Sequence, residues 1–162
     1  MSNTWAISAP HIGYQPITDT STTQNHPIGT RVKAINSTYG DCEFIYLKGV
    51  ASTAANDLCI FDTKTPSTTR AVAGSRGPCG VAMSANVASQ YGWYCIAGSI
   101  NITAGTVAAN GNVYVTSTAG TVDDAVVSGD KVDGARFKSA DGTPAAGQAV
   151  VQLAYPSLNA NG

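Results

Sequence analysis

The chain has 162 residues, only 12% of them are charged, and its formal net charge is −1 at pH 7. This length is enough for one compact domain that buries a core without relying on disulfides or metal ions. The near-neutral charge argues against a nucleic-acid binder and against a polybasic membrane-surface protein, because both need a basic surface.

Residues 1–30 are predicted to form an extended N-terminal arm. Pro10, Pro16 and Pro27 prevent a continuous helix and bias their neighbours toward extended backbone. Ordering an arm costs about 1–2 kcal/mol per residue in backbone entropy, more than a lone small domain is expected to recover. The arm is therefore expected to dock along a neighbouring subunit or to stay disordered, and its spaced apolar residues favour docking. These candidate interface residues are Trp5, Ile7, Ile12, Tyr14 and Ile17.

Residues 31–156 are predicted to form a β domain, followed by a C-terminal tail at 157–162. The segment "RVKAIN" alternates charged and apolar residues, as a half-buried strand does. Turn residues such as Gly129–Asp130, Asp133–Gly134 and Asp141–Gly142 separate further β-rich segments. Residues 83–92 are compatible with either a short helix or a turn. The pattern predicts an all-β fold, an antiparallel sandwich or barrel of short strands.

The four cysteines, Cys42, Cys59, Cys79 and Cys95, are widely spaced and include no CxxC pair. The N-terminus lacks the basic and apolar segments of a secretion signal, so we expect synthesis in a reducing cytoplasm. Free, buried thiols are the resulting prediction. A zinc site is not expected, because closely spaced pairs of ligands are missing.

The sequence offers little material for catalysis. Both histidines, His11 and His26, lie in the predicted arm. The aspartates between residues 123 and 141 lack the spacing of a calcium loop, and turn aspartates are usually solvated. Asn36 and Asn101 match the glycosylation pattern, which we interpret as a chance match. We expect no enzyme activity, no catalytic residue, no cofactor and no metal; a hydrolase using Asp123 or Asp130 is the weakest hypothesis.

Trp93 and Tyr94 are the remaining candidates for a binding surface. They suit either a sugar-stacking platform or an interface anchor. Because neighbouring residues of a strand face opposite ways, one of the two is expected to be core.

Three segments together resemble the capsid decoration, or cement, proteins of tailed bacteriophages. They are "RVKAINSTYGDCEFIYLKGVAST", "GPCGVAMSANVASQYGWYCIAG" and "VVSGDKVDGARFKSADGTPAAGQAVVQL". The resemblance covers about residues 31–155 and consists of Gly-punctuated strands and a closing strand, without a catalytic signature. It implies a β-rich domain that binds the major capsid protein on the outer head surface and bridges capsomers. It also implies homo-oligomers, trimers rather than dimers, and location on the virion after assembly in the host cytoplasm.

Two function hypotheses from different classes follow. The first is a virion structural protein that stabilises the capsid as a decoration protein. The alternative is the tip of a head or tail fibre that binds a host-surface glycan through Trp93 or Tyr94.

Overall fold

The computed structural model describes residues 5–7, 14–65 and 67–159. These residues form strands, turns and loops. The strands are β1 (Ala6–Ile7), β2 (Arg31–Asn36), β3 (Gly40–Lys48), β4 (Leu58–Phe61), β5 (Thr68–Arg70), β6 (Gly77–Ala82), β7 (Tyr91–Thr103), β8 (Asn112–Val115), β9 (Val122–Asp123), β10 (Lys131–Phe137) and β11 (Gln148–Leu158). The predicted all-β class is confirmed. Of residues 83–92, the possible helix, 83–90 form bends and a turn, and residues 91 and 92 begin β7. Within the described residues, no helix is long and apolar enough to cross a membrane.

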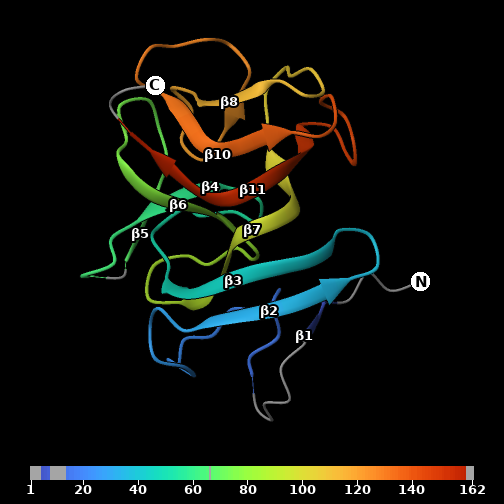
Figure 1. Cartoon of the computed structure of the whole chain (residues 1–162). Helices are drawn as coiled ribbons and strands as arrows, with labels where there is room; N and C mark the ends of the chain where they lie inside the picture. The colour runs from blue at the N-terminus through green and yellow to red at the C-terminus, as the bar shows by residue number, and fades with distance from the viewer. Residues whose placement is uncertain (1–4, 8–13, 66, 160–162) are drawn as a thin grey trace.

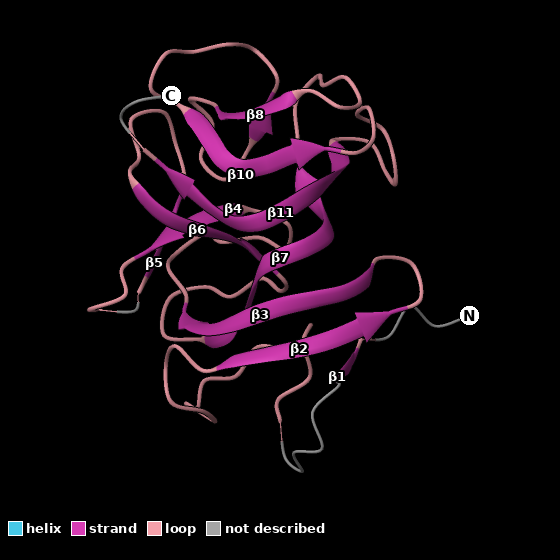
Figure 2. Cartoon of the chain, in the orientation of Figure 1, coloured by secondary structure: helices cyan, strands magenta, loops and turns pink. Residues whose placement is uncertain are grey.

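The strands join one antiparallel sheet that does not close into a barrel. The order along the sheet is β1-β2-β3-β7-β6-β11-β10-β8-β9, and β4 pairs with both β5 and β6. Figure 1 shows β2 and β3 in the lower half of the molecule and β8 and β10 in the upper half, with β7 running between them. Figure 2 shows the loops that connect the strands at the upper and lower ends of the molecule.

The long strand β7 joins the two halves. Its first part pairs with β3, from Tyr91 opposite Lys48 to Ala97 opposite Glu43. Its second part pairs with β11, ending with Thr103 opposite Gln148. A strand shared in this way bends the sheet over itself, so the two halves enclose a core between them as in a sandwich.

The layer made by β3 and β7 is buried on both faces. Phe44 and Tyr46 of β3 belong to the large core cluster, whereas Ile45 and Leu47 belong to a second, smaller cluster. Successive side chains of a strand point to opposite faces, so this split shows that each face of β3 is covered by protein. The second cluster includes Cys59 and Phe61 of β4, which cover that side.

Residues 14–30, here called the strap, differ from the prediction of an arm. They begin on the other face of the β3–β7 layer, where Ile17 is buried in the chain's own core, and end just beyond Ile28, which packs against the smaller cluster. The side chain of Gln15 is also buried and receives a hydrogen bond from the Tyr46 hydroxyl at 2.9 Å. The strap thus covers an aromatic face, around Tyr46 and Trp93, that the sheet alone leaves open. This apolar cover offsets the ordering entropy of the segment, so docking on a neighbouring subunit is not needed to order it.

The C-terminal boundary also differs from the prediction. Strand β11 continues past Pro156 to Leu158, which is fully buried. Ser157 pairs with Pro78 of β6 and with Asp133 of β10. Pro156 is tolerated in this strand because the backbone is irregular there, with Tyr155 at φ +50°. Residues 157 and 158 are therefore part of the domain rather than of a tail.

Candidate functional site

The two residues predicted as a surface platform are both core residues. The side chains of Trp93 and Tyr94 each have 0% relative exposure. The Trp93 indole donates a hydrogen bond to the backbone oxygen of Gln15 at 2.8 Å, and Asn86 donates one to the Tyr94 hydroxyl at 2.8 Å. The expectation that only one of the pair is buried was wrong, because the strap covers the Trp93 side and β4 covers the Tyr94 side. Neither ring can stack on a glycan or anchor a partner in this fold.

The predicted interface residues of the arm contact the chain itself. Trp5 packs edge-on against Phe44, with ring centroids 4.9 Å apart, and Ile7 packs against the same core. Tyr14 stacks on His26 at 5.0 Å. Trp5, Ile7 and Tyr14 stay partly exposed, Ile17 is buried, and Ile12 lies outside the described residues. The structure therefore brings the described anchors together over the domain's own sheet rather than along a separate arm.

A different group of residues forms an ordered site on the surface. The Tyr155 hydroxyl donates a hydrogen bond to Oε2 of Glu43 at 2.6 Å. Arg31 approaches the same carboxylate, with Nη1 3.6 Å from Oε1, and its guanidinium lies 5.9 Å from the centroid of the Tyr155 ring. Strands β2, β3 and β11 thus each supply one member of this Arg–Glu–Tyr group, which orients an aromatic ring that is 57% exposed.

Gly134 lies where β10 closely approaches the backbone on both sides of Tyr155 in β11. It lies at φ +75° in β10, where a Cβ atom would stand 2.6 Å from the backbone oxygen of Ala154. The pairing of β10 with β11 shifts register between Asp133 and Ala135, so that residues 154–156 of β11 stand opposite Gly134 alone, which marks a bulge in β11. Tyr155, in the bulged segment of β11, takes the left-handed conformation, which is rare for a residue with a side chain. The Asp133–Gly134 pair, predicted as a turn, instead lies within strand β10, opposite this bulge.

A shallow groove runs beside the Arg–Glu–Tyr group. One hollow of about 90 Å³ is lined by Arg31, Phe61, Thr63, Pro78, Cys79, Ile96, Tyr155 and Pro156. A second hollow of about 200 Å³ shares Arg31, Phe61 and Thr63 and extends to Ile28 and Leu47. Tyrosine and arginine are enriched among the residues that dominate protein–protein binding energies, and here both stand beside apolar walls. We call the Arg–Glu–Tyr group and these two hollows the contact groove.

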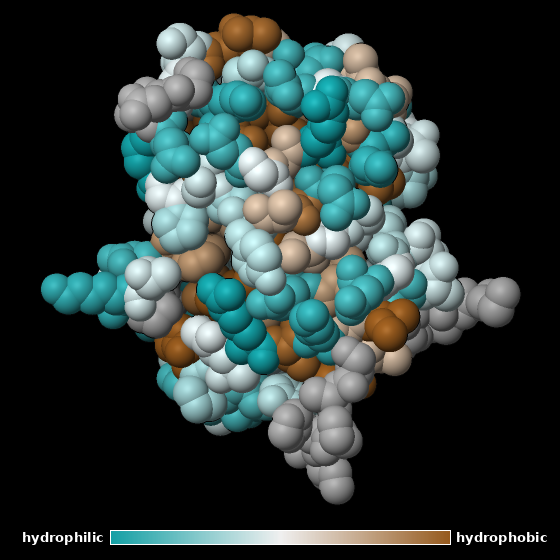
Figure 3. All heavy atoms as spheres, in the orientation of Figure 1, coloured by the Kyte–Doolittle hydropathy of each residue, from teal (hydrophilic) through white to brown (hydrophobic). Residues whose placement is uncertain are grey.

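A second exposed apolar site lies in the loop between β9 and β10. Val126 is 81% exposed and Val127 is 46% exposed. The loop arches over the top of the molecule in Figure 1, and Figure 3 shows a hydrophobic patch at that end. Its base is fixed by Asp130, whose buried carboxylate accepts the backbone N–H of Gly74 at 2.8 Å and lies 3.7 Å from Nη1 of Arg76. We call residues 124–129 the valine loop.

The acidic residues considered for hydrolysis hold loops in place. Asp123 accepts the backbone N–H of Ala125 at 3.1 Å, and Asp124 accepts that of Ala108 at 2.8 Å. Asp130 is occupied at the base of the valine loop. Within the part of the chain that the structure describes, no group of three or more His, Cys, Asp or Glu side chains is arranged to hold a metal ion.

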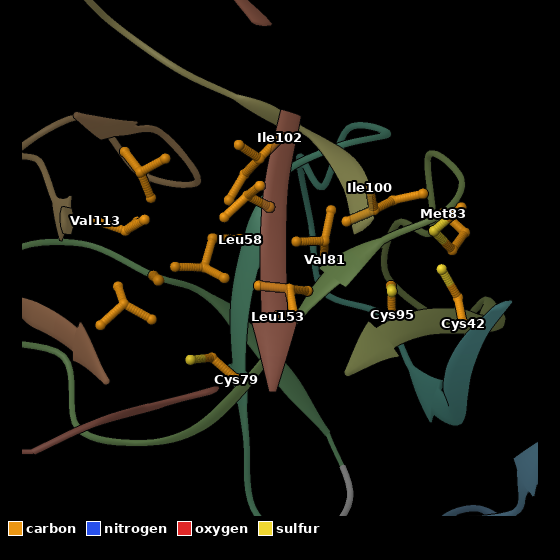
Figure 4. Close-up of a cluster of buried hydrophobic side chains, with 14 of the residues drawn as sticks. Cys42, Leu58, Cys79, Val81, Met83, Cys95, Ile100, Ile102, Val113 and Leu153 are labelled. Atoms are coloured by element: carbon orange, nitrogen blue, oxygen red, sulfur yellow. The ribbon is translucent and has the colours of Figure 1, made fainter. Parts of the chain in front are cut away.

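The four cysteines are free and buried, as the sequence predicted. Figure 4 shows Cys42, Cys79 and Cys95 among core side chains such as Leu153. Burial raises the pKa of the Cys59 thiol to about 12 and also raises those of Cys79 and Cys95. The thiol of Cys42, which shares a hydrogen bond with Cys95, has a lowered pKa but is itself buried. A thiol needs both a thiolate form and access to react, so these side chains act as core residues.

The two glycosylation patterns fall on asparagines with structural bonds. The Asn36 side chain is buried and accepts the backbone N–H groups of Thr38 and Tyr39 at 2.8 and 3.2 Å. Asn101 accepts the Tyr39 hydroxyl at 2.5 Å. These contacts account for both residues within the fold.

Tyr155 and Arg31 are not among the residues that the sequence predicts for a binding surface. A signal was present, because Tyr155 directly precedes a proline near the end of a predicted strand. Tyr155 and Glu43 are nevertheless 112 positions apart in the sequence, so only the pairing of the strands reveals that they are in contact. No protein-family model matches this chain, and no curated protein matches it significantly.

Proposed function

We propose that this chain is a virion structural protein that decorates the capsid of a tailed bacteriophage and stabilises the shell by bridging its subunits. The proposal rests on the sequence resemblance and on one structural observation above all. Two exposed apolar sites, the contact groove and the valine loop, lie on different parts of one compact domain. A protein that joins two neighbours needs two separate contact sites of this kind.

The chemistry of the two sites supports binding rather than catalysis. The contact groove presents an oriented tyrosine and arginine, and the valine loop presents aliphatic side chains on a fixed base. Each contact can be weak if many copies act together on one particle. In this proposal the major capsid protein is the partner and the copies associate with one another, as trimers rather than dimers.

The test is the binding of purified chain to heads that lack it. Tyr155→Ala is expected to weaken binding at least tenfold, because it removes an exposed anchor that the fold has already oriented. Thr22→Ala, at an exposed position of the strap, is the matched control and is expected to bind like the wild type. Equal binding by Tyr155→Ala and the wild type would remove the contact groove from the proposal.

The alternative function, recognition of a host glycan, is favoured by one feature of the same groove. Tyr155 is an exposed ring beside a carboxylate and a guanidinium, a combination that suits a sugar. Trp93 and Tyr94 no longer carry this alternative, because both are buried. Binding of the wild type to host-surface glycans, lost in Tyr155→Ala and accompanied by no binding to heads, would select the glycan function.

A further inference from the structure

Gln15 is the residue through which the strap is fastened to the sheet. Its side-chain oxygen accepts the Tyr46 hydroxyl at 2.9 Å, and its side-chain nitrogen donates to the backbone oxygen of Tyr91 at 3.1 Å. Its backbone oxygen accepts the Trp93 indole N–H at 2.8 Å. These groups come from β3 and β7, so the position of Gln15 decides whether the strap covers the aromatic face.

His26 completes this arrangement from the other end of the strap. Its Nε2 atom accepts the backbone N–H of Gln15 at 3.0 Å. The imidazole is enclosed by Tyr14 and Tyr46, both at 5.0 Å between ring centroids, and by Trp93 at 5.5 Å. An Nε2 atom that accepts a hydrogen bond carries no proton, so the ring in this geometry is neutral.

We propose that His26 is an acid-sensitive latch: protonation of its Nε2 atom breaks the bond from Gln15 and releases the strap from the β3–β7 layer. The added proton would point at the Gln15 N–H, so two donors would face each other where a hydrogen bond had been. The charged ring would also pack among aromatic side chains that shield it partly from water. Release would uncover Trp93 and Tyr46, which the strap now buries.

His26 is the group in this aromatic cluster that binds a proton in weak acid. The aromatic side chains that pack against the imidazole are Tyr14 from the strap, Tyr46 from β3 and Trp93 from β7, and tyrosine and tryptophan do not bind protons in weak acid. Burial lowers the pKa of His26 below its ordinary value of 6.5. The aromatic faces can attract a cation, which opposes this effect, so the measured titration is a direct check.

The direction of the pH dependence follows from linkage. A released His26 binds its proton near pH 6.5, and a docked His26 binds it only at lower pH. The docked strap is therefore most stable above that value and loses stability as the pH falls below it. One linked proton changes the docking equilibrium by at most about tenfold per pH unit.

The experiment is amide hydrogen exchange of the full chain at about pH 7.5 and about pH 5, corrected for intrinsic exchange rates. Protection of residues 15–26 is expected to fall at the lower pH, while protection of β11 is retained. His26→Gln removes the titration and keeps an acceptor, so its strap is expected to remain protected at both values. His11→Gln, which changes the other histidine, is expected to behave like the wild type. An unchanged wild-type strap, or a pH response that persists in His26→Gln, would overturn the proposal.

A second measurement covers the case in which His26→Gln does not fold. Imidazole and amide resonances of the wild-type chain can be followed by NMR through the same pH range. The latch requires a His26 pKa below 6.5 and a Gln15 amide shift that titrates with it. A His26 pKa at or above 6.5 would contradict the latch. These readouts use the isolated chain, so they do not depend on capsid binding.

Discussion

Trp93 has a structural role, although the sequence suggested a role in surface binding. Its ring is fully buried, and its N–H satisfies the backbone oxygen of Gln15. We expect Trp93→Ala to lower the free energy of unfolding by about 3–5 kcal/mol, because it leaves a cavity and an unpaired acceptor. Val126→Ala, at a position that is 81% exposed, is the control and should change it by less than about 0.5 kcal/mol. Urea denaturation measures both, and a loss below about 1 kcal/mol for Trp93→Ala would conflict with the described core.

The thiols give a second test at the residue scale. All four are free and buried, and the pKa of Cys59 is raised to about 12. We expect the melting temperature to be the same with and without dithiothreitol. A thiol reagent should react slowly with the native chain and with four groups after denaturation. A melting temperature that drops in dithiothreitol would reveal a disulfide and refute the assignment.

At the scale of elements, local pattern predicted the strands better than their connections. The alternation in "RVKAIN" gives β2 at Arg31–Asn36, because a strand with one exposed face shows its period in sequence. The Asp133–Gly134 pair has the same local signature whether it forms a turn or lies opposite a bulge. The neighbouring strand β11 decides between them, and that pairing is not visible in a local window. For the same reason the Tyr155–Glu43 contact could not be predicted.

The close approach at Gly134, opposite the bulge, can be tested against a second glycine. Gly134→Ala places a Cβ 2.6 Å from the backbone oxygen of Ala154 at a positive φ. Gly142→Ala also has a positive φ, but no atom lies within 4 Å of its new Cβ. Gly142→Ala therefore measures the backbone cost alone, about 1–2 kcal/mol. We expect Gly134→Ala to destabilise more and to weaken binding through Tyr155; equal effects on stability would mean that the contact with Ala154 is not limiting.

At the scale of the whole molecule, the strap changes the interpretation of the N-terminal region. Entropy alone suggested that an extended segment needs a neighbouring subunit to dock on. That estimate omitted the aromatic face of Tyr46 and Trp93, which the strap covers within one chain. In the proposed function, contacts with partners therefore fall to surfaces that the fold leaves exposed, the contact groove and the valine loop.

Electron cryo-microscopy of the virus particle proposed to carry this chain tests the proposed role as a shell protein most directly. We expect regular copies over the outer head surface, with the Arg31–Tyr155 groove or the valine loop against the major capsid protein. Density confined to a tail or a fibre tip, or particles without the chain, would contradict the proposed function.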